Sequence, residues 1–464
     1  MECVSKGQVP LREIARQLRD DTISARDLAE AACDIYQRRG SSDHAYATWT
    51  GELASKTATE VDQLLRLGHD TGPLMGIPLS VKDVFGLPDL PIFAGLDERL
   101  PEAFERPGRV MQGTLRQLPS MMGKTHTVPL AFGGLGLSAA RGTPRNPWDS
   151  TTPRAPGGSS SGAGVSVATG TARLAFGSDT HGSVRLPAAM TGVAGLKVTA
   201  GRWPTDGMVP LSSTLDTPGL LALTCDDLSF GVAAVDAALG RSGAERPPPD
   251  IAGLRLGVAD DFFWEGCSKG VAEAVKDCIA QLESAGARFV PVELPGAEEI
   301  YDIFQSGGLA ASELATFLQE SLPHVRQRLE PHIEARIAAA EGIPAVEYIR
   351  RLRCAEIHAR RAEEQLASVD AVLMPTVPIT TPKLAEIEDK QAYARVNMQA
   401  LRNASVINFL GLCAATLPAG RDAEGMPVGL HLVGKAWSDD RILSLGRAIE
   451  GCIGDGPTLL GELP

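Results

Sequence analysis

Three segments of the sequence carry residue types that nucleophilic chemistry needs. The first, 157–162, is rich in glycine and serine, and the second, 177–187, places Ser183 after a run of small residues. Small residues let successive backbone N–H groups point at one spot, and such a spot stabilises the oxyanion of an acyl-transfer intermediate. The third is Lys82, which follows the largely apolar segment 74–81. These segments are candidates for acyl-transfer chemistry if the fold brings them together.

Each segment also has an ordinary structural explanation. Residues 157–162 could form a flexible turn, and they are not a phosphate-binding loop because no Gly-Lys-Ser/Thr ending follows the glycines. They do contain the Gly-x-Ser-x-Gly pattern of the α/β-hydrolase nucleophile elbow, centred on Ser160, so that interpretation competes. Lys82 precedes Asp83, which is typical of a solvated or ion-paired lysine. If Lys82 were buried among serines instead, its charged form would be disfavoured, and a neutral amine accepts a proton.

Charged residues and a histidine flank Ser183. His181 lies two residues before it, which invites a Ser–His pair, but this spacing does not by itself position an imidazole as the base, and the sequence assigns no Asp partner. Asp179 and Arg185 are expected to support the loop through a charge-assisted hydrogen bond, or else to form an ordinary surface pair. The sequence leaves both questions open.

The elements that must position these segments alternate between helix and strand. Ser24 is a predicted N-cap for a helix over 24–38, residues 74–84 are predicted as a strand, and the loop 142–164 runs into a predicted buried helix over 165–169. The later predicted elements are strands over 254–259, 288–294 and 370–375 and helices over 271–285 and 345–366. This alternation indicates an α/β fold, and without internal repeats or an obvious linker it indicates one large domain.

Composition and charge exclude several classes of function. The 464 residues carry a formal net charge of −13, which disfavours nucleic acid and anionic membranes as partners, because lysine and arginine supply the attraction there. The longest apolar stretch, 406–419, is shorter than the roughly 18 residues that a membrane span needs. The amino terminus lacks the apolar centre of a secretory signal, so a cytoplasmic location is expected. Eight cysteines are scattered singly, so neither a zinc site nor a disulfide framework is predicted.

Taken together, the three chemical segments resemble the amidase signature family of serine hydrolases, which use a Ser-Ser-Lys triad. Gly-Gly-Ser-Ser at 157–160 and Gly-Ser-Asp-Thr-x-Gly-Ser-Val-Arg-Leu-Pro-Ala-Ala at 177–189 resemble the family signature, and Gly-Ile-Pro-Leu-Ser-Val-Lys-Asp at 76–83 resembles its catalytic-lysine segment. Further similar segments lie at 123–125, 142–147, 192–197, 370–376 and 427–434. The resemblance spans nearly the whole chain.

The resemblance implies a role for each member of the triad. Ser183 is expected to be the nucleophile, Ser159 the bridging serine that the family holds in a cis peptide, and Lys82 the terminal base. Neutral Lys82 would take a proton from Ser159, which would take one from Ser183, so that Ser183 attacks an amide carbonyl and forms an acyl-enzyme. The expected oxyanion hole consists of the backbone N–H groups of Thr180, His181, Gly182 and Ser183.

The resemblance also suggests a substrate pocket. Phe132 and Gly133 fall on the segment that often borders the acyl group, although Phe132 is nearly as well explained as ordinary core. His181 stands where the family commonly has glycine, and it is expected to narrow the pocket or contact substrate. Ser161 likewise replaces a frequent glycine, and His126 replaces a frequent asparagine.

The family fold is a single large mixed β-sheet sandwiched between layers of α-helices, here expected as one amidase domain over 1–464. Within it we expect a helical region over about 1–70, the signature core over about 71–230 and the remainder of the α/β domain over about 231–464.

The implied function is hydrolysis of a small aryl or aliphatic carboxamide to a carboxylic acid and ammonia or an amine. The alternative is the glutamine-hydrolysing subunit of a tRNA-dependent amidotransferase, which works in an obligate complex. An inactive member of the fold is a third hypothesis, disfavoured because all three triad residues are present. The relay needs neither a metal nor an organic cofactor, and none is predicted. No nucleic-acid or membrane partner is expected, and a homodimer is compatible with the resemblance.

Overall fold

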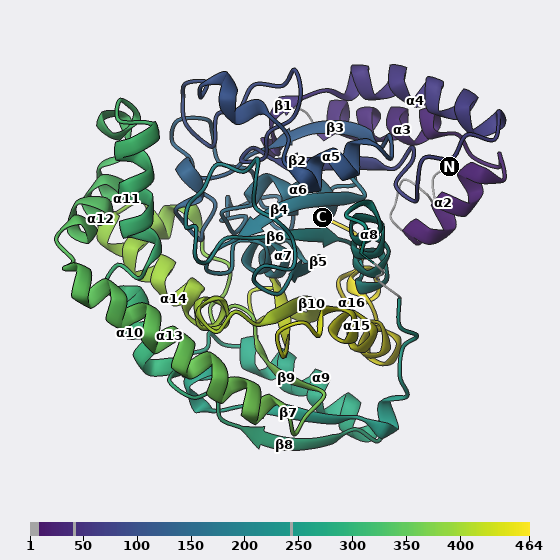
Figure 1. The fold of residues 1–464 in the computed structure, drawn as a ribbon. Helices are drawn as coiled ribbons and strands as arrows, with labels where there is room; N and C mark the ends of the chain where they lie inside the picture. Colours follow the sequence, from purple (N-terminus) through teal and green to yellow (C-terminus); the bar gives the residue numbers. More distant parts are fainter. Residues whose placement is uncertain (1–8, 40–42, 242–244) are drawn as a thin grey trace.

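A mixed β-sheet of 11 strands runs through the protein, whose computed structural model describes residues 9–39, 43–241 and 245–464 (Figure 1). In spatial order the strands are β1 (Tyr46–Trp49), β3 (Ser120–Thr125), β2 (Pro78–Lys82), β4 (Leu174–Asp179), β6 (Thr217–Ala222), β5 (Ala194–Lys197), β10 (Cys413–Arg421), β11 (Pro427–Gly434), β9 (Ala371–Pro375), β7 (Arg255–Ala259) and β8 (Arg288–Val292).

Parallel and antiparallel pairs occur in blocks across this sheet. β2 lies between β3 and β4 and is parallel to both, whereas each pair from β4 through to β9 is antiparallel. β7 returns to parallel pairing with β8 and β9. β2, β4, β5, β6 and β9 are buried at every residue, as expected of strands covered on both faces.

Helices cover both faces of the sheet. Ala371 and Leu373 of β9 pack in one apolar cluster, and Val372 and Met374 pack in another. Since successive side chains of a strand point to opposite faces, the two clusters lie on opposite sides of the sheet. The first cluster includes residues of α8 (Cys225–Ala238), α9 (Val271–Ser284) and α15 (Asp439–Ile453), and the second includes residues of α10 (Ala297–Gln305), α13 (Ala345–Leu366) and α14 (Lys390–Phe409). This arrangement confirms the predicted sandwich.

The remaining helices complete the two layers. They are α2 (Leu11–Arg19), α3 (Ala25–Arg39), α4 (Gly51–Arg66), α5 (Arg109–Leu115), α6 (Ser161–Ala168), α7 (Arg185–Thr191), α11 (Ala310–Ser321), α12 (Pro331–Glu341) and α16 (Gly456–Leu460). Figure 1 shows α2, α3 and α4 grouped at one corner, with α10 to α13 along the opposite side. Among the described residues, no helix has the length and apolar character needed to cross a membrane.

Several predicted elements are confirmed. The helix predicted over 24–38 is α3, and the Ser24 hydroxyl accepts a hydrogen bond from the Asp27 N–H at 3.0 Å, as an N-cap does. The predicted strand–helix–strand unit is β7, α9 and β8, with the two strands parallel. The long helix over 345–366 is α13, and the strand predicted over 370–375 is β9.

Two predictions about element boundaries are wrong. α6 begins at Ser161 rather than at residue 165, because the glycines that suggested a loop allow close packing: a Cβ on Gly162 would lie 2.0 Å from the Ala45 carbonyl oxygen. The region expected to be helical, about 1–70, also contains strand β1, and its residues 1–8 and 40–42 lie outside the described part of the chain. Because one sheet takes strands from both halves of the sequence, we propose that the chain folds as the single expected domain.

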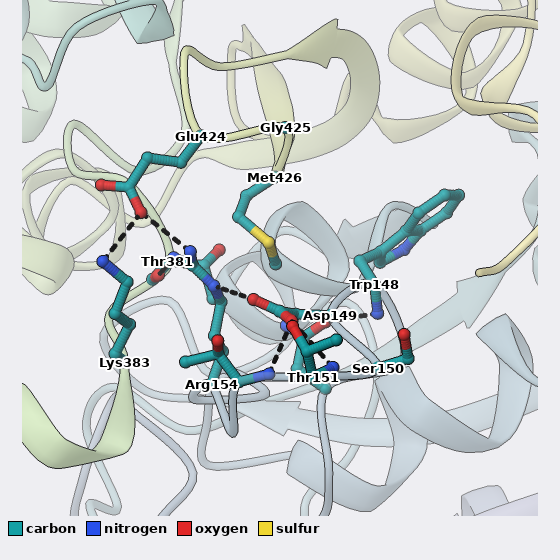
Figure 2. A network of polar contacts seen from close by, with 12 residues as sticks. Trp148, Asp149, Ser150, Thr151, Arg154, Thr381, Lys383, Glu424, Gly425 and Met426 are labelled. Atoms are coloured by element: carbon teal, nitrogen blue, oxygen red, sulfur yellow. Dashed lines mark hydrogen bonds and ion pairs between the residues drawn. The ribbon is translucent and has the colours of Figure 1, made fainter.

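The loop that leads into the glycine- and serine-rich segment is anchored by Arg154 (Figure 2). The Arg154 side chain is 6% exposed and lies between two carboxylates, 2.8 Å from Asp149 and 2.8 Å from Glu424. It also donates to the carbonyl of Thr381 at 2.9 Å, and Lys383 pairs with the same Glu424 at 3.3 Å. Arg154 therefore ties this loop to two segments more than 200 residues away in the sequence.

We predict that Arg154→Met lowers the free energy of unfolding by about 2 kcal/mol, because it leaves the partly buried Asp149 without its charged partner. The midpoint of guanidinium unfolding, followed by tryptophan fluorescence, measures the change. Arg26→Met is the matched control, since it removes the exposed Arg26–Glu30 pair and should leave the midpoint unchanged. Equal midpoints for the two variants would contradict the anchoring role.

Candidate active site

Lys82 is the last residue of β2, and its side chain is fully buried. Its Nζ donates hydrogen bonds to Ser159 Oγ at 2.6 Å and to Ser178 Oγ at 2.8 Å, and it lies 3.4 Å from the Ser178 carbonyl oxygen. All three acceptors are neutral. The lysine is therefore held among serines inside the protein rather than paired with a carboxylate at the surface.

Burial lowers the pKa of the Lys82 amine from an ordinary value of 10.5 to about 7. Desolvation is the largest cause, and the negative charges of Asp216 and Asp179 oppose it only in part. A large fraction of the amine is consequently neutral near pH 7. A neutral amine in contact with a hydroxyl is able to accept its proton.

Ser159 follows a cis peptide bond from Gly158 and lies just before α6. The Gly158 N–H donates to the Gly134 carbonyl at 2.7 Å, and a Cβ on Gly158 would lie 2.6 Å from the Gly136 nitrogen. Only glycine fits at position 158, because any side chain there would collide with the backbone of Gly136. The glycines on both sides thus bring segment 133–136 directly against Gly158, the residue before Ser159.

Ser183 lies in the loop between β4 and α7 and is 4% exposed. Its carbonyl accepts a hydrogen bond from the Ser160 N–H at 3.1 Å, which holds the Ser183 loop next to the residue that follows Ser159. In the described part of the chain the Ser183 hydroxyl makes no hydrogen bond to Ser159. The structure therefore joins Lys82 to Ser159 directly and brings the Ser183 backbone beside them.

Asp179 and Arg185 form a fully buried ion pair beneath this loop, not a surface pair. Two Arg185 nitrogens each donate to an Asp179 oxygen at 3.0 Å, and Asp179 also accepts from the backbone N–H groups of Gly182 at 2.7 Å and Val184 at 3.0 Å. Burial opposes ionisation of Asp179, but the Arg185 charge and hydrogen bonds outweigh it and hold the pKa of the carboxyl well below its usual range. The pair thus fixes the backbone on both sides of Ser183.

This bracing corrects one expectation about the oxyanion hole. The Gly182 N–H donates to Asp179, so it is occupied by a carboxylate rather than pointing at a reacting carbonyl. The N–H groups of Thr180, His181 and Ser183 stay as proposed donors. Thr180 is held by a different carboxylate, because its hydroxyl donates to Asp216 at 2.5 Å.

His181 lies in an aromatic environment. Its ring centroid is 4.8 Å from that of Phe304 and 5.9 Å from that of Phe409. Burial, with a smaller contribution from the charge of Arg336, lowers the pKa of the imidazole to about 3, so the ring is neutral. Its Nε2 is buried without a hydrogen-bond partner among the described residues. These features favour a side chain that faces substrate over a base for Ser183.

The structure places Phe132 in the core, and the proposed role of Phe132 and Gly133 beside the acyl group stays a prediction. Phe132 is buried and packs in an apolar cluster, yet the Arg336 guanidinium lies over its ring, 3.6 Å from the centroid. A Cβ on Gly133 would lie 2.9 Å from the Tyr393 hydroxyl, so this position is crowded by a polar group from α14. His126 lies behind the triad loop, where its carbonyl accepts from the Ser161 hydroxyl at 3.3 Å.

Two residues near Lys82 were not predicted from the sequence. Ser178 lies within the segment 177–187 but no pattern there assigns it a role, although its hydroxyl is a direct partner of Lys82. Asp216 is partly buried and accepts hydrogen bonds from Thr180 and from the backbone N–H groups of Leu211 and Ser212. Burial raises the pKa of Asp216 to about 6. No local sequence pattern marks this aspartate, because its partners come from other segments.

One cluster in the described residues has side chains that could hold a metal ion. Potential ligand atoms of Glu299, Cys354 and His358 all lie within 4.8 Å of one another, and His358 Nε2 is 3.0 Å from Glu299. The sequence prediction missed the group because Cys354 and His358 are four residues apart on α13 while Glu299 comes from α10. None of its residues contacts the triad.

Comparison with protein-family models matches residues 27–443 to the amidase family. The chain belongs to the amidase family. It is 46% identical over 464 residues to 2-amino-5-chloromuconic acid deaminase from Comamonas testosteroni, covering 99% of this chain and 100% of that protein. It is 31% identical to a glutamyl-tRNA(Gln) amidotransferase subunit from Carboxydothermus hydrogenoformans, covering 95% of this chain and 96% of that protein.

Solved structures agree with this assignment. A crystal structure of an amidase matches with a TM-score of 0.86 at 28% identity, covering 96% of this chain and 100% of that one. The mixed sheet between helical layers is thus the amidase signature fold. The protein is a hydrolase that acts on carbon–nitrogen amide bonds of small substrates.

We predict that kcat/KM for an amide substrate falls about tenfold per pH unit below pH 7, because protonation of Lys82 removes the neutral amine. A profile from pH 5 to 9 measures this. Lys82→Met should give a small residual rate without that acidic limb. A wild-type profile that stays level down to pH 5 would show that this amine is not the titrating base.

Proposed function

We propose that the enzyme hydrolyses a small carboxamide to a carboxylic acid and ammonia or an amine, with Ser183 as nucleophile, Ser159 as bridging serine and Lys82 as base. The observation that carries this proposal is the 2.6 Å hydrogen bond between the buried Lys82 amine and the Ser159 hydroxyl. A base with a pKa of about 7 is well matched to proton transfer near neutral pH. The hydrogen bond from the Ser160 N–H to the Ser183 carbonyl holds the Ser183 loop beside Ser159, which supports the second step of the relay, proton transfer from Ser183 to Ser159.

Acylation is a proton relay coupled to attack. Lys82 takes the Ser159 proton, and Ser159 takes the Ser183 proton, while Ser183 Oγ forms a bond to the amide carbon. The carbonyl oxygen becomes an oxyanion, which the N–H groups of Thr180, His181 and Ser183 stabilise. The proton on Lys82 then returns through Ser159 to the leaving nitrogen, the carbon–nitrogen bond breaks, and an ester of Ser183 remains. Water repeats the sequence on that ester and releases the acid.

Ser178 has a positioning role in this scheme. Its hydroxyl and carbonyl oxygens both face Lys82 Nζ. When Lys82 carries the transferred proton, these oxygens accept hydrogen bonds from the ammonium group. Ser178 therefore keeps the amine aimed at Ser159 in both of its protonation states.

The relative at 46% identity supports a second substrate class. Its name describes removal of an amino group from 2-amino-5-chloromuconic acid. The identity extends over the whole chain, so we include small amino-substituted unsaturated acids beside carboxamides as candidate substrates. For such an acid, the oxygen of water would replace the amino group on its carbon atom and ammonia would leave.

The amidotransferase subunit is the weaker candidate, because identity to those relatives is 31% or less. A subunit of that kind needs its complex, whereas the proposed enzyme works alone or as a homodimer, without metal or organic cofactor. We further propose a cytoplasmic enzyme that needs neither nucleic acid nor membrane. Ammonia release from a simple amide by the purified chain separates the two candidates.

We predict that Lys82→Ala and Ser159→Ala each lower kcat by about a hundredfold or more, since each interrupts the relay. Ser160→Ala is the matched control: it removes the neighbouring hydroxyl, which within the described part of the chain donates to the Ser178 carbonyl, and it should retain most of the activity. The α/β-hydrolase interpretation requires the reverse pattern, loss with Ser160→Ala and tolerance of Lys82→Ala.

We predict that an acyl-enzyme forms on Ser183. Brief reaction with an activated ester, quenching and mass mapping of peptides should place the label on Ser183, and Ser183→Ala should carry none. A label on Ser159 or Ser160 in the wild type would overturn the assignment of the nucleophile.

A further inference from the structure

Next to the proposed active site lies Arg336, a cation with no carboxylate partner among the residues that the structure describes. It lies on α12 and is partly buried. Its guanidinium packs over the Phe132 ring at 3.6 Å, and Nη1 lies 3.3 Å from the Phe132 carbonyl oxygen, to which it donates. Both of these contacts are neutral, and among the described residues no aspartate or glutamate forms an ion pair with Arg336.

Two buried arginines of this protein, Arg154 and Arg185, do have acidic partners. Arg154 pairs with Asp149 and Glu424, and Arg185 pairs with Asp179. A guanidinium that is taken out of water without an opposite charge is electrostatically unsatisfied, and burial accordingly lowers the pKa of Arg336 to about 10. An incoming anion would supply the missing charge.

The position of Arg336 connects it to the triad. Phe132 is followed by Gly133 and Gly134, and the Gly134 carbonyl accepts the 2.7 Å hydrogen bond from the N–H of Gly158, which precedes Ser159. A Cβ on Gly158 would also lie 3.2 Å from the Gly133 carbonyl oxygen. The backbone beneath Arg336 is therefore the same backbone that packs against the bridging serine.

His181 connects Arg336 to the nucleophile loop. The positive charge of Arg336 contributes to the lowered pKa of His181, which places the guanidinium within electrostatic range of this imidazole, two residues from Ser183. The rings of Phe304 and Phe409 flank the imidazole, and its Nε2 lacks a hydrogen-bond partner among the described residues. The surroundings thus combine the Arg336 guanidinium, for which the described residues supply no carboxylate, with a neutral imidazole and apolar rings.

We propose that Arg336 binds a carboxylate group of the substrate, so that the enzyme selects small compounds that carry an acid group as well as the scissile carbon–nitrogen bond. This inference rests on the proposed function, because it takes Ser183 as the place of reaction. The planar guanidinium offers N–H groups in the geometry that a carboxylate accepts, while the aromatic rings beside His181 accommodate the apolar body between the two ends. A lysine at this position would supply the positive charge but not the paired N–H groups of a planar guanidinium.

A pair of matched substrates tests the proposal. Fumaramate carries a carboxylate and an amide, and crotonamide has a methyl group in place of the carboxylate. We expect wild-type kcat/KM to be about a hundredfold higher for fumaramate. Arg336→Met should lower kcat/KM for fumaramate about a hundredfold, mainly through KM, and change that for crotonamide less than threefold. Arg336→Lys should recover part of the loss.

Arg402→Met is the control variant. Arg402 also lies over a phenylalanine ring, 5.4 Å from the centroid of Phe262, and donates to the carbonyl of Glu265. The Arg402→Met variant should leave kcat/KM unchanged for both fumaramate and crotonamide. Equal loss on both substrates in Arg336→Met, or wild-type preference for crotonamide, would overturn the proposal while leaving the hydrolase assignment intact.

Direct binding separates this inference from the proposed function. Calorimetric titration of the Ser183→Ala protein with muconate, a dicarboxylate, needs no turnover. We expect binding that Arg336→Met weakens about a hundredfold and Arg402→Met does not change. Absence of muconate binding, or equal binding with Arg336→Met, contradicts the carboxylate site even if amides are hydrolysed. Muconate binding through Arg336 without hydrolysis of either amide supports the site and contradicts the amide reaction.

Discussion

The rest of the site depends on one physical constraint, the burial of the Lys82 amine away from water and against serine hydroxyls. β2 and β4 are parallel neighbours, so their carboxyl ends meet at one edge of the sheet, where Lys82 ends β2 and Ser178 and Asp179 end β4. Burial at this edge removes water from the amine and leaves serine oxygens as its partners. The same topology therefore provides both the low proton affinity of the lysine and the hydroxyl that it contacts.

The loop that carries Ser183, the proposed nucleophile, is fixed by residues from distant parts of the chain. Arg185, which pairs with Asp179, also contacts His431 on β11 at 3.0 Å and donates to the Ala404 carbonyl on α14 at 3.1 Å. Asn408, also on α14, donates to Asp179 at 2.9 Å. Signature-like segments far beyond the serines, such as 427–434, thus have a physical reason: they hold the ion pair that holds the loop. Removing water from so many charged groups is tolerated because each has a partner.

The sequence predicts the parts of this site that are local in the chain. The two serine segments and the lysine segment each carry a recognisable pattern, and the helix after Ser24 and the unit β7–α9–β8 follow from periodicity and capping. Residues supplied by tertiary packing carry no such pattern: Asp216 and Arg336 lie in segments with no motif. The occupied N–H of Gly182 likewise depends on where Asp179 points, which composition does not determine.

The most direct test of the central claim is the titration of Lys82 itself. Lysine labelled with ¹³C at Cε reports the ionisation of each amine by NMR, and the Lys82→Met variant identifies the resonance. We expect a midpoint near pH 7, well below that of an ordinary lysine. A midpoint near 10 would contradict it, because the amine would then stay charged throughout the range in which the relay has to operate.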